Sequence, residues 1–262
     1  MVQFAADHWH PCAAYLYILH LDGPALAWEY LRRHPDYRRD WLRRRRDPDA
    51  AQAWGLRLLE DPGLDAREAH PAWFPDHDSV VQLYPDADPP PDAERFAFWR
   101  LSGSKHLVHD GRRLVLLLRS VGHSLRAALA PGMIEGVPYV CALRASRKSC
   151  SGRCALMHEL TELAASAPMA LAQPRPTSTA LLELHTLQAL DGALAGASLR
   201  AVAQVLFGVA AVAGDWHADG ALRARVRRLI RRGRGLMGGG YRQLAQLPAA
   251  GRGRFAPIAE RP

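Results

Sequence analysis

The spacing of apolar residues predicts helices near the N-terminus. Four of these residues recur three or four positions apart, as on one helix face: Leu26, Ala27, Tyr30 and Leu31. Pro24 suits the first turn of this helix, and the sequence His34-Pro35-Asp36 is expected to end it. A second short helix should then carry Tyr37 and Trp41. Residues 1–60 are therefore predicted to form a small helical domain.

The pattern changes in the middle of the chain. Residues 61–94 are rich in proline, contain the run Asp88-Pro-Pro-Pro91 near their end and show little periodicity, so they are predicted to form an extended linker. From Arg95 to about Leu143 the apolar residues are spaced as in strands. The turn sequence Asp110-Gly111 precedes the apolar run Leu114–Leu118, which predicts a small β-hairpin or meander.

Helical character returns after Cys150. Helices are predicted from Ala155 to Ala165 and from Thr179 to Leu190, and Asp191-Gly192 is expected to end the second of them. A last short helix should follow the three glycines Gly238–Gly240, because they interrupt any helix that precedes them.

Two helices of this C-terminal region have the order of a helix-turn-helix. Ser198 is a natural N-cap for a helix over Leu199–Phe207, which Gly208 should stop. A basic helix is expected from about Asp219 to Gly233. The connection between them, Val209–Ala218, is longer than the usual three or four residues, so either the motif is a variant or the connection adds a helical turn.

These patterns predict an α+β fold that is mainly α. A small N-terminal helical domain (1–60) and a Pro-rich linker (61–94) are followed by residues 95–262, which hold a short β-hairpin or meander and a C-terminal helix-turn-helix-like domain. The longest apolar run, Val205–Gly214, is shorter than the roughly 18 residues of a membrane span. The first residues do not resemble a signal peptide. We therefore expect a cytoplasmic, nucleoid-associated protein without a membrane partner.

The positive charge is concentrated at the C-terminal end of the chain. Residues 1–190 contain 22 basic and 22 acidic residues, whereas residues 191–262 contain 12 arginines and four acidic residues, which is the whole net charge of +8. A segment of this charge has a polyanion as its natural partner.

The predicted basic helix separates an apolar stripe from arginines. At 100° per residue, Leu222, Val226, Leu229 and Ile230 fall on one narrow stripe that should face the core. The arginines occupy the other sides of the helix: Arg223, Arg225, Arg227, Arg228, Arg231, Arg232 and Arg234. Like charges three or four positions apart repel one another, and an anion would relieve that repulsion. The planar guanidinium of arginine can bind phosphate or the edge of guanine with two hydrogen bonds, which favours duplex DNA as the anion.

A second interpretation of this arginine surface is open at the level of sequence. A charged helix face is often only solvated, and arginine can simply reflect a genome rich in G and C. The lack of acidic residues between Leu222 and Gln243 speaks against this interpretation, because solvated faces usually mix both signs.

A shorter basic run, Arg43–Arg46 beside Trp41, is also typical of a nucleic-acid contact. Four acidic residues lie nearby in the sequence and could neutralise it: Asp36, Asp40, Asp47 and Asp49. For this run we therefore favour a structural role over a contact with DNA.

Other patterns point only weakly to chemistry. Cys150, Cys154 and His158 would share a helix face, but the ligand pairs typical of structural zinc are incomplete, so ordinary reduced cysteines are expected. The glycine-rich segment Gly233–Gly240 lacks the ending of a phosphate-binding loop and is interpreted as a turn. We find no catalytic motif, and predict neither an enzyme nor a bound cofactor.

The chain resembles known bacterial regulators at several places. These are Tyr15–Leu19, Ala27–Trp41, Leu59–Pro71, Asp110–Leu114, Gly196–Arg200, Leu206–Gly208, Trp216, Leu222–Ile230 and Gly239–Leu244. The N-terminal segments resemble a transcriptional-regulator-like domain of proteobacteria, and the C-terminal segments resemble a domain of unknown function described as a helix-turn-helix variant. Leu244-Ala245 departs from the pair of leucines in that pattern, and residues Cys150–Cys154 have no place in it.

The resemblance implies transcriptional control of an integrative and conjugative element. Some such proteins activate transcription, while others are antiactivators that mask another regulator, so both roles are open. In the first role the partner is double-stranded DNA, together with another transcription regulator or RNA polymerase. The resemblance implies that Ser198 and Arg200 belong to the first helix of the DNA-binding unit. The expected DNA-binding residues are Ser198, Arg200, Arg223, Arg225, Arg227, Arg228, Arg231 and Arg232.

Overall fold

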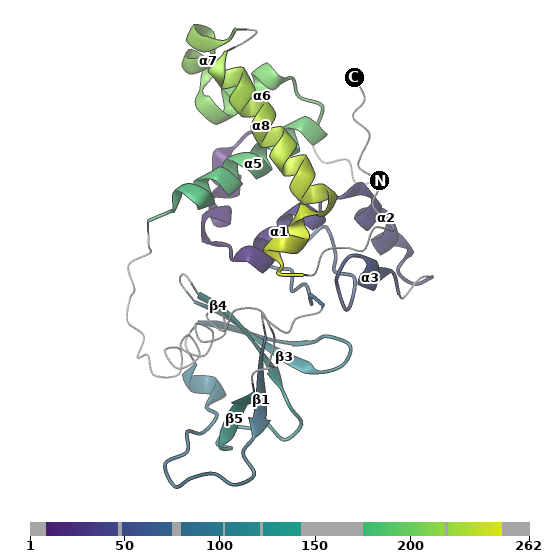
Figure 1. Ribbon diagram of the computed structural model, residues 1–262, viewed down its shortest axis with the longest axis vertical. Coiled ribbons are helices and arrows are strands. Elements are labelled where there is room, and N and C mark those ends of the chain that lie inside the picture. Colours follow the sequence, from purple (N-terminus) through teal and green to yellow (C-terminus); the bar gives the residue numbers. More distant parts are fainter. Residues whose placement is uncertain are drawn as a thin grey trace. The chain divides into compact units, whose positions relative to one another are not determined.

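In the computed structural model, the two ends of the sequence form helices and the residues between them in the sequence form a sheet (Figure 1). The structure describes residues 9–46, 49–74, 80–101, 103–120, 123–142, 175–217 and 220–247. The predicted α+β fold, mainly α, is confirmed. The chain divides into two compact units, a helical unit drawn from residues 1–47, 60–69 and 175–262 and a sheet unit drawn from residues 48–59 and 70–174.

The N-terminal helices begin and end where local sequence signals place them. A 3-10 helix, η1 (Cys12–His20), precedes α1 (Gly23–Leu31) and α2 (Pro35–Arg43). The Asp22 carboxylate accepts a hydrogen bond of 2.8 Å from the Ala25 N–H and so caps α1. The predicted break before Pro35 is confirmed, because His34 has an extended backbone and its ring nitrogen accepts from the Asp36 N–H.

The central helix of the helical unit, α5 (Ser178–Leu194), runs further than its sequence predicts. Asp191-Gly192 does not end it, so that prediction is wrong. Gly192 lies inside the helix, at a position where a Cβ would lie 3.0 Å from both the Trp9 ring and the Val202 side chain. Tight packing, and not helix termination, accounts for this glycine.

The C-terminal helices follow α5 in close succession. They are α6 (Leu199–Phe207), α7 (Val209–Asp215), α8 (Ala221–Gly235), the π-helical turn η3 (Leu236–Gly240) and α9 (Tyr241–Leu244). The Ser198 hydroxyl accepts a hydrogen bond of 3.1 Å from the Ala201 N–H, which confirms the predicted N-cap. Gly208 ends α6 with a φ of +90°. The long connection contains α7, one of the two alternatives that the spacing left open.

The basic helix α8 also extends beyond its predicted end at Gly233. This glycine is buried, and a Cβ there would lie 3.0 Å from Cβ of Leu190 on α5. Gly233 therefore lets α8 approach α5 closely. The change of direction comes later, at Gly239, whose φ is +141°.

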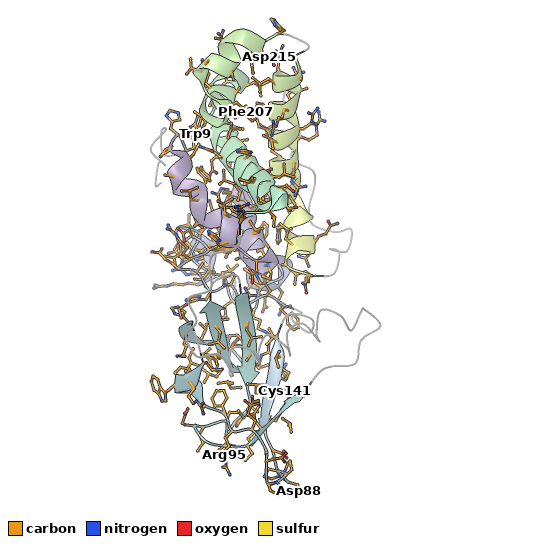
Figure 2. All side chains as sticks on the ribbon, turned by 90° about the vertical axis from the view of Figure 1, so that its left-hand side faces the viewer. Trp9, Asp88, Arg95, Cys141, Phe207 and Asp215 are labelled. Atoms are coloured by element: carbon orange, nitrogen blue, oxygen red, sulfur yellow. The ribbon has the colours of Figure 1, made fainter. Side chains whose placement is uncertain are left out.

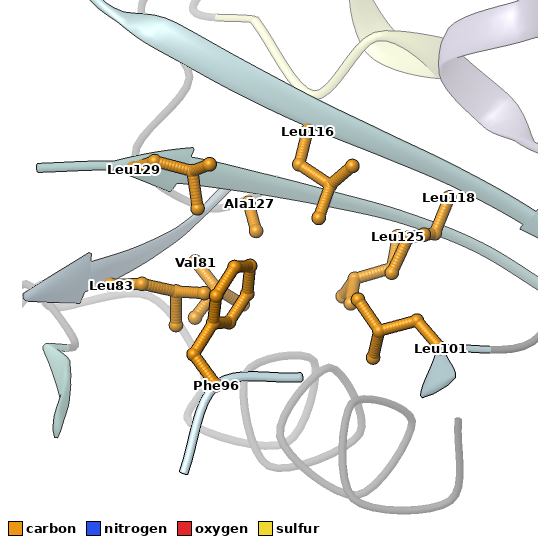
Figure 3. Packing of buried hydrophobic residues seen from close by; sticks show 9 residues of the cluster. All are labelled: Val81, Leu83, Phe96, Leu101, Leu116, Leu118, Leu125, Ala127 and Leu129. Atoms are coloured by element: carbon orange, nitrogen blue, oxygen red, sulfur yellow. The ribbon is translucent and has the colours of Figure 1, made fainter. Parts of the chain in front are cut away.

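The sheet unit contains five described strands in the order β2-β3-β4-β1-β5. They are β1 (Val81–Pro85), β2 (Ser104–His109), β3 (Leu114–Ser120), β4 (His123–Leu129) and β5 (Tyr139–Ala142); the short helices α3 (Ala50–Ala53) and η2 (Phe98–Arg100) belong to the same unit. The predicted hairpin is β2 and β3, which pair antiparallel, while β1 pairs parallel with β4. Figure 3 shows the core on one face of the sheet, made of Val81, Leu83, Phe96, Leu101, Leu116, Leu118, Leu125, Ala127 and Leu129.

The structure contradicts an extended linker over residues 61–94. Residues Val81–Pro85 form a strand between β4 and β5, and Val81 and Leu83 are buried. The prolines around this strand hide its alternating pattern. Earlier in the same segment, Leu64 accepts a hydrogen bond from the Trp28 indole, and the Ala66 N–H donates to Glu29, so this part belongs to the helical unit.

Several predicted features lie outside the described residues, namely the helix over Ala155–Ala165, the group Cys150, Cys154 and His158, and Asp219. Within the described residues, every helix is too short or too polar to cross a lipid bilayer.

Candidate nucleic-acid interface

Helix α8 is anchored in the helical unit by its apolar side. Val226, Leu229 and Ile230 are buried, as the 3.6-residue spacing predicts, and α8 packs on α5 and α6. Leu222, the fourth residue of the predicted stripe, is half-buried. The orientation of the helix is therefore fixed by its core contacts.

The arginines of α8 lie on the sides that this packing leaves open. Arg223 is half-buried, and the other six are exposed: Arg225, Arg227, Arg228, Arg231, Arg232 and Arg234. The structure thus places six of the seven predicted guanidinium groups of this helix at the surface. They do not all have the same surroundings.

Arg232 is paired with a buried carboxylate. Its Nη2 donates to Oε1 of Glu183 on α5, and the other carboxylate oxygen of Glu183 accepts a hydrogen bond of 2.5 Å from the Tyr30 hydroxyl on α1. The Glu183 side chain is 2% exposed and that of Arg232 is 40% exposed. Burial raises the pKa of Tyr30, and the charge of Glu183 raises it further, so the phenol stays protonated as the donor. These three residues connect α1, α5 and α8.

Arg225 lies against an aromatic side chain. Its guanidinium carbon is 4.9 Å from the centre of the Phe207 ring. Phe207 lies at the C-terminal end of α6 (Figure 2). The centre of the His185 ring on α5 lies 6.0 Å from the centre of the Phe207 ring. Burial lowers the pKa of His185, and the nearby charge of Arg225 lowers it further. His185 is therefore neutral at neutral pH and adds no charge beside Arg225.

Four arginines make up the rest of the exposed surface of α8: Arg227, Arg228, Arg231 and Arg234. Within the described part of the chain, none of the four forms an ion pair or a hydrogen bond through its side chain. Arg227 and Arg231, and likewise Arg228 and Arg231, are spaced so that their charges repel. We call these four residues the arginine face of α8.

Ser198 and Arg200 lie at the opposite end of α6 from Phe207. Both are exposed. Phe207 lies eight positions after Leu199, which is roughly 12 Å along a helix axis. The Ser198 hydroxyl already caps α6 but keeps its own hydrogen to donate. The structure therefore brings Arg225 to the end of α6, while Ser198 and Arg200 stand at a separate position on that helix.

Glu183 is a residue of this region that the sequence analysis missed. It belongs to a predicted helix and has leucines on both sides, so a single acidic residue on a buried helix face was the only available signal. A buried carboxylate is normally paired, but the sequence does not identify its partners 49 and 153 residues away.

Three family models match parts of the chain. A proteobacterial transcriptional regulator-like domain matches residues 8–58, a domain of unknown function matches residues 78–125, and a family described as the DNA-binding domain of a T6SS transcription factor matches residues 144–246. The first match confirms the N-terminal resemblance. The third assigns DNA binding to the region that contains α5 to α9.

A search of curated proteins found no match. The two functional descriptions therefore come from the N-terminal and C-terminal family models. Together they support one coarse conclusion: this is a DNA-binding transcriptional regulator.

Proposed function

We propose that the protein regulates transcription by binding duplex DNA sequence-specifically through the exposed side of α8. One observation carries this proposal: the apolar side of α8 is fixed in the core, while the arginine face has no carboxylate partner among the described residues. An α-helix fits the major groove of B-form DNA, where arginine reads the O6 and N7 atoms of guanine.

Each site residue has a proposed role. Arg223, Arg227 and Arg231 lie along one side of α8 and would reach base edges or phosphates in the groove. Arg225 and Arg228 lie on the other side and would bind the neighbouring phosphates. Ser198 and Arg200 would hold a phosphate at the start of α6, where the unpaired N–H groups of a helix favour an anion.

Arg232 has a different proposed role, because its guanidinium is already paired with Glu183. We assign it to holding α8 in position, with its remaining N–H groups available to a phosphate. Arg232 therefore differs from the other arginines of α8, although the sequence alone does not distinguish them.

The proposal is tested by measuring the affinity for duplexes selected from genomic DNA of the native host. In the variant Arg227→Ala/Arg228→Ala/Arg231→Ala we expect affinity to fall at least 100-fold, because an arginine that reads a base is worth about 1–3 kcal/mol. We also expect the slope of log K against log salt to become less negative by about 0.9 for each phosphate that the variant no longer binds.

A matched control removes three exposed arginines elsewhere, in the variant Arg100→Ala/Arg112→Ala/Arg175→Ala. It has the same net charge as the first variant and should bind within a few fold of the wild type. Unchanged binding by the α8 variant would overturn the proposed function.

We further propose that the regulated genes belong to an integrative and conjugative element. This rests on the resemblance of the segments around Ala27–Trp41 and Leu222–Ile230 to such regulators. Sequencing the genomic fragments bound at two salt concentrations tests the assignment, because specific sites should persist at the higher concentration. Fragments drawn evenly from the genome would contradict it.

The alternative is an antiactivator that masks another regulator. It predicts a stoichiometric protein partner in a pull-down from the native host and little salt-sensitive retention on DNA. The exposed arginine face favours the DNA-binding role, because masking a protein does not require unpaired guanidinium groups.

A further inference from the structure

A second cluster of arginines lies at the C-terminal end of α2, in the same helical unit as α8. We call Arg43–Arg46 the α2 cluster. All four residues are exposed, as is the adjacent Leu42. The sequence context of this cluster, with four acidic residues nearby, suggests that these acidic residues neutralise it.

None of the described acidic side chains forms an ion pair with the cluster, and Asp47 lies outside the described residues. Arg44 stacks on the Trp41 ring, with its guanidinium carbon 3.9 Å from the ring centre, and its Nη1 donates to the Trp41 carbonyl. Asp36 is paired with Arg39, at 2.8 Å, and not with the cluster. Within the described residues, Arg43, Arg45 and Arg46 have neither an ion pair nor a side-chain hydrogen bond. Stabilisation of the helix C-terminus accounts for one or two cations near the last turn but not for four.

The cluster is held firmly on the helical unit. Tyr37 of α2 is fully buried, its hydroxyl donates to the Glu60 carbonyl at 2.7 Å, and its ring meets the Trp28 ring edge-on at 5.6 Å. Helix α1, which leads directly into α2, is joined to α8 through Tyr30, Glu183 and Arg232.

The other end of α8 also leads toward α1. Helix α8 continues into η3 and α9, and both pack on α1. A Cβ on Gly23, at the start of α1, would lie 2.6 Å from the Leu244 carbonyl oxygen, so the two segments are in direct contact. Helices α2 and α8, which carry the α2 cluster and the arginine face, therefore belong to one compact body (Figure 1).

We propose that the α2 cluster binds the phosphate backbone of the same duplex whose groove receives α8. This inference rests on the proposed function. Two arginine surfaces on one body, neither bound by a carboxylate among the described residues, suit a long polyanion, because binding at the first surface brings the neighbouring phosphates close to the second. Contacts to phosphates position a protein on DNA but do not read its sequence. The cluster thus adds affinity and fixes orientation, while α8 supplies the specificity.

The test uses the full-length variant Arg43→Ala/Arg45→Ala/Arg46→Ala, which keeps Arg44 because that residue packs on Trp41. On the selected duplex, the slope of log K against log salt should become less negative by about 2–3, at 0.9 for each phosphate that is no longer bound. Affinity at about 0.1 M salt should fall at least tenfold. The ratio of affinities for selected and scrambled duplexes should stay unchanged, and hydroxyl-radical footprinting should lose one block of protected backbone.

Two comparison variants sharpen this test. Arg43→Lys/Arg45→Lys/Arg46→Lys keeps the charges and should keep most of the salt slope, since lysine also binds phosphate. Arg100→Ala/Arg112→Ala/Arg175→Ala changes the net charge equally. If it weakens binding as much as the α2 variant does, the effect is that of the general field and the inference is overturned.

The outcomes also separate this inference from the proposed function. If the α8 variant loses DNA and the α2 variant binds like the wild type with an unchanged footprint, the inference is overturned while the function stands. The same holds if the α2 variant keeps DNA affinity but loses an acidic protein partner. If the α8 variant binds DNA like the wild type, the proposed function itself is overturned.

Discussion

Arginines occur in two contrasting settings within the helical unit. Arg33, which follows α1, has a side chain that is only 8% exposed and lies between Glu29 and Asp191. Its Nε and Nη2 donate to the two oxygens of Asp191, at 2.6 and 2.8 Å. The arginine face of α8 is exposed and has no carboxylate partner among the described residues.

The difference shows how the same residue type serves two purposes. A buried guanidinium must be paired within the protein, because leaving it unpaired costs several kcal/mol. An exposed one is solvated and remains available to an external anion. Arg232, which is 40% exposed and paired with Glu183, stands between the two settings. The contrast predicts that breaking a buried arginine pair lowers the free energy of unfolding, whereas removing the exposed arginines leaves it nearly unchanged or raises it slightly.

The largest effect is expected from breaking the buried pair with Asp191→Asn. Asp191 accepts hydrogen bonds from Arg33 and from the Tyr15 hydroxyl, at 2.7 Å for the latter. Removal of its charge leaves Arg33 with Glu29 alone. We expect the free energy of unfolding to fall by about 3–5 kcal/mol, measured by urea denaturation.

The matched control for this variant is Asp36→Asn. Asp36 is paired with Arg39 at the surface, where both side chains are more than half exposed. This change should cost less than about 1 kcal/mol. Equal losses in the two variants would refute the distinction between buried and exposed pairs.

The buried carboxylates should also make stability depend on acid pH. Burial alone would raise the pKa values of Glu29 and Asp191, but Arg33 outweighs it, with help from Arg32, and holds both below their usual values. Carboxylates with a lowered folded pKa contribute stability that is complete above the unfolded pKa and is lost as pH falls through the folded pKa. Stability should therefore decline below about pH 4.5.

The measurement is the free energy of unfolding as a function of pH for the wild type and Asp191→Asn. In the variant the slope below about pH 4.5 should be shallower by up to one proton, or about 1.4 kcal/mol per pH unit. Parallel curves would show that Asp191 does not contribute in this way.

A smaller effect is expected at the intermediate pair. Glu183→Gln removes the charge that Arg232 pairs with, but Arg232 can still be solvated, and an amide oxygen can still accept from Tyr30. We expect a loss of about 1.5–3 kcal/mol in unfolding free energy. Tyr30→Phe removes a single hydrogen bond to the same carboxylate and should cost less, about 1 kcal/mol. A larger loss in Tyr30→Phe than in Glu183→Gln would contradict the proposed role of the pair.

The parts of this region that the sequence predicts are those set by local rules. The cap at Ser198, the end of α6 at Gly208 and the buried stripe of α8 all depend on residues close together in the chain, and the structure confirms them. The exposure of the arginines follows from the same helical periodicity, since the stripe fixes which side faces outward.

The missed features depend on contacts distant in sequence. Asp191-Gly192 looks like a helix end until Trp9, Val202 and Arg33 pack against it, the last from 158 positions away. Strand β1 was missed because the surrounding prolines mask its alternation, while its partners β4 and β5 follow about 40 residues later or more. Pairing of Arg232 with Glu183 likewise requires the folded unit.

The smallest effect on stability is expected where the effect on DNA binding is largest. In Arg227→Ala/Arg228→Ala/Arg231→Ala no pair within the described residues is broken, so the unfolding free energy should change by less than about 0.5 kcal/mol. Its sign should be stabilising, because removal of repulsion at three- and four-residue spacing and the higher helix propensity of alanine both favour α8. Urea denaturation of the wild type and this variant measures the difference. A destabilisation of more than about 1 kcal/mol would mean that these guanidinium groups support the fold and are not held free for an anion.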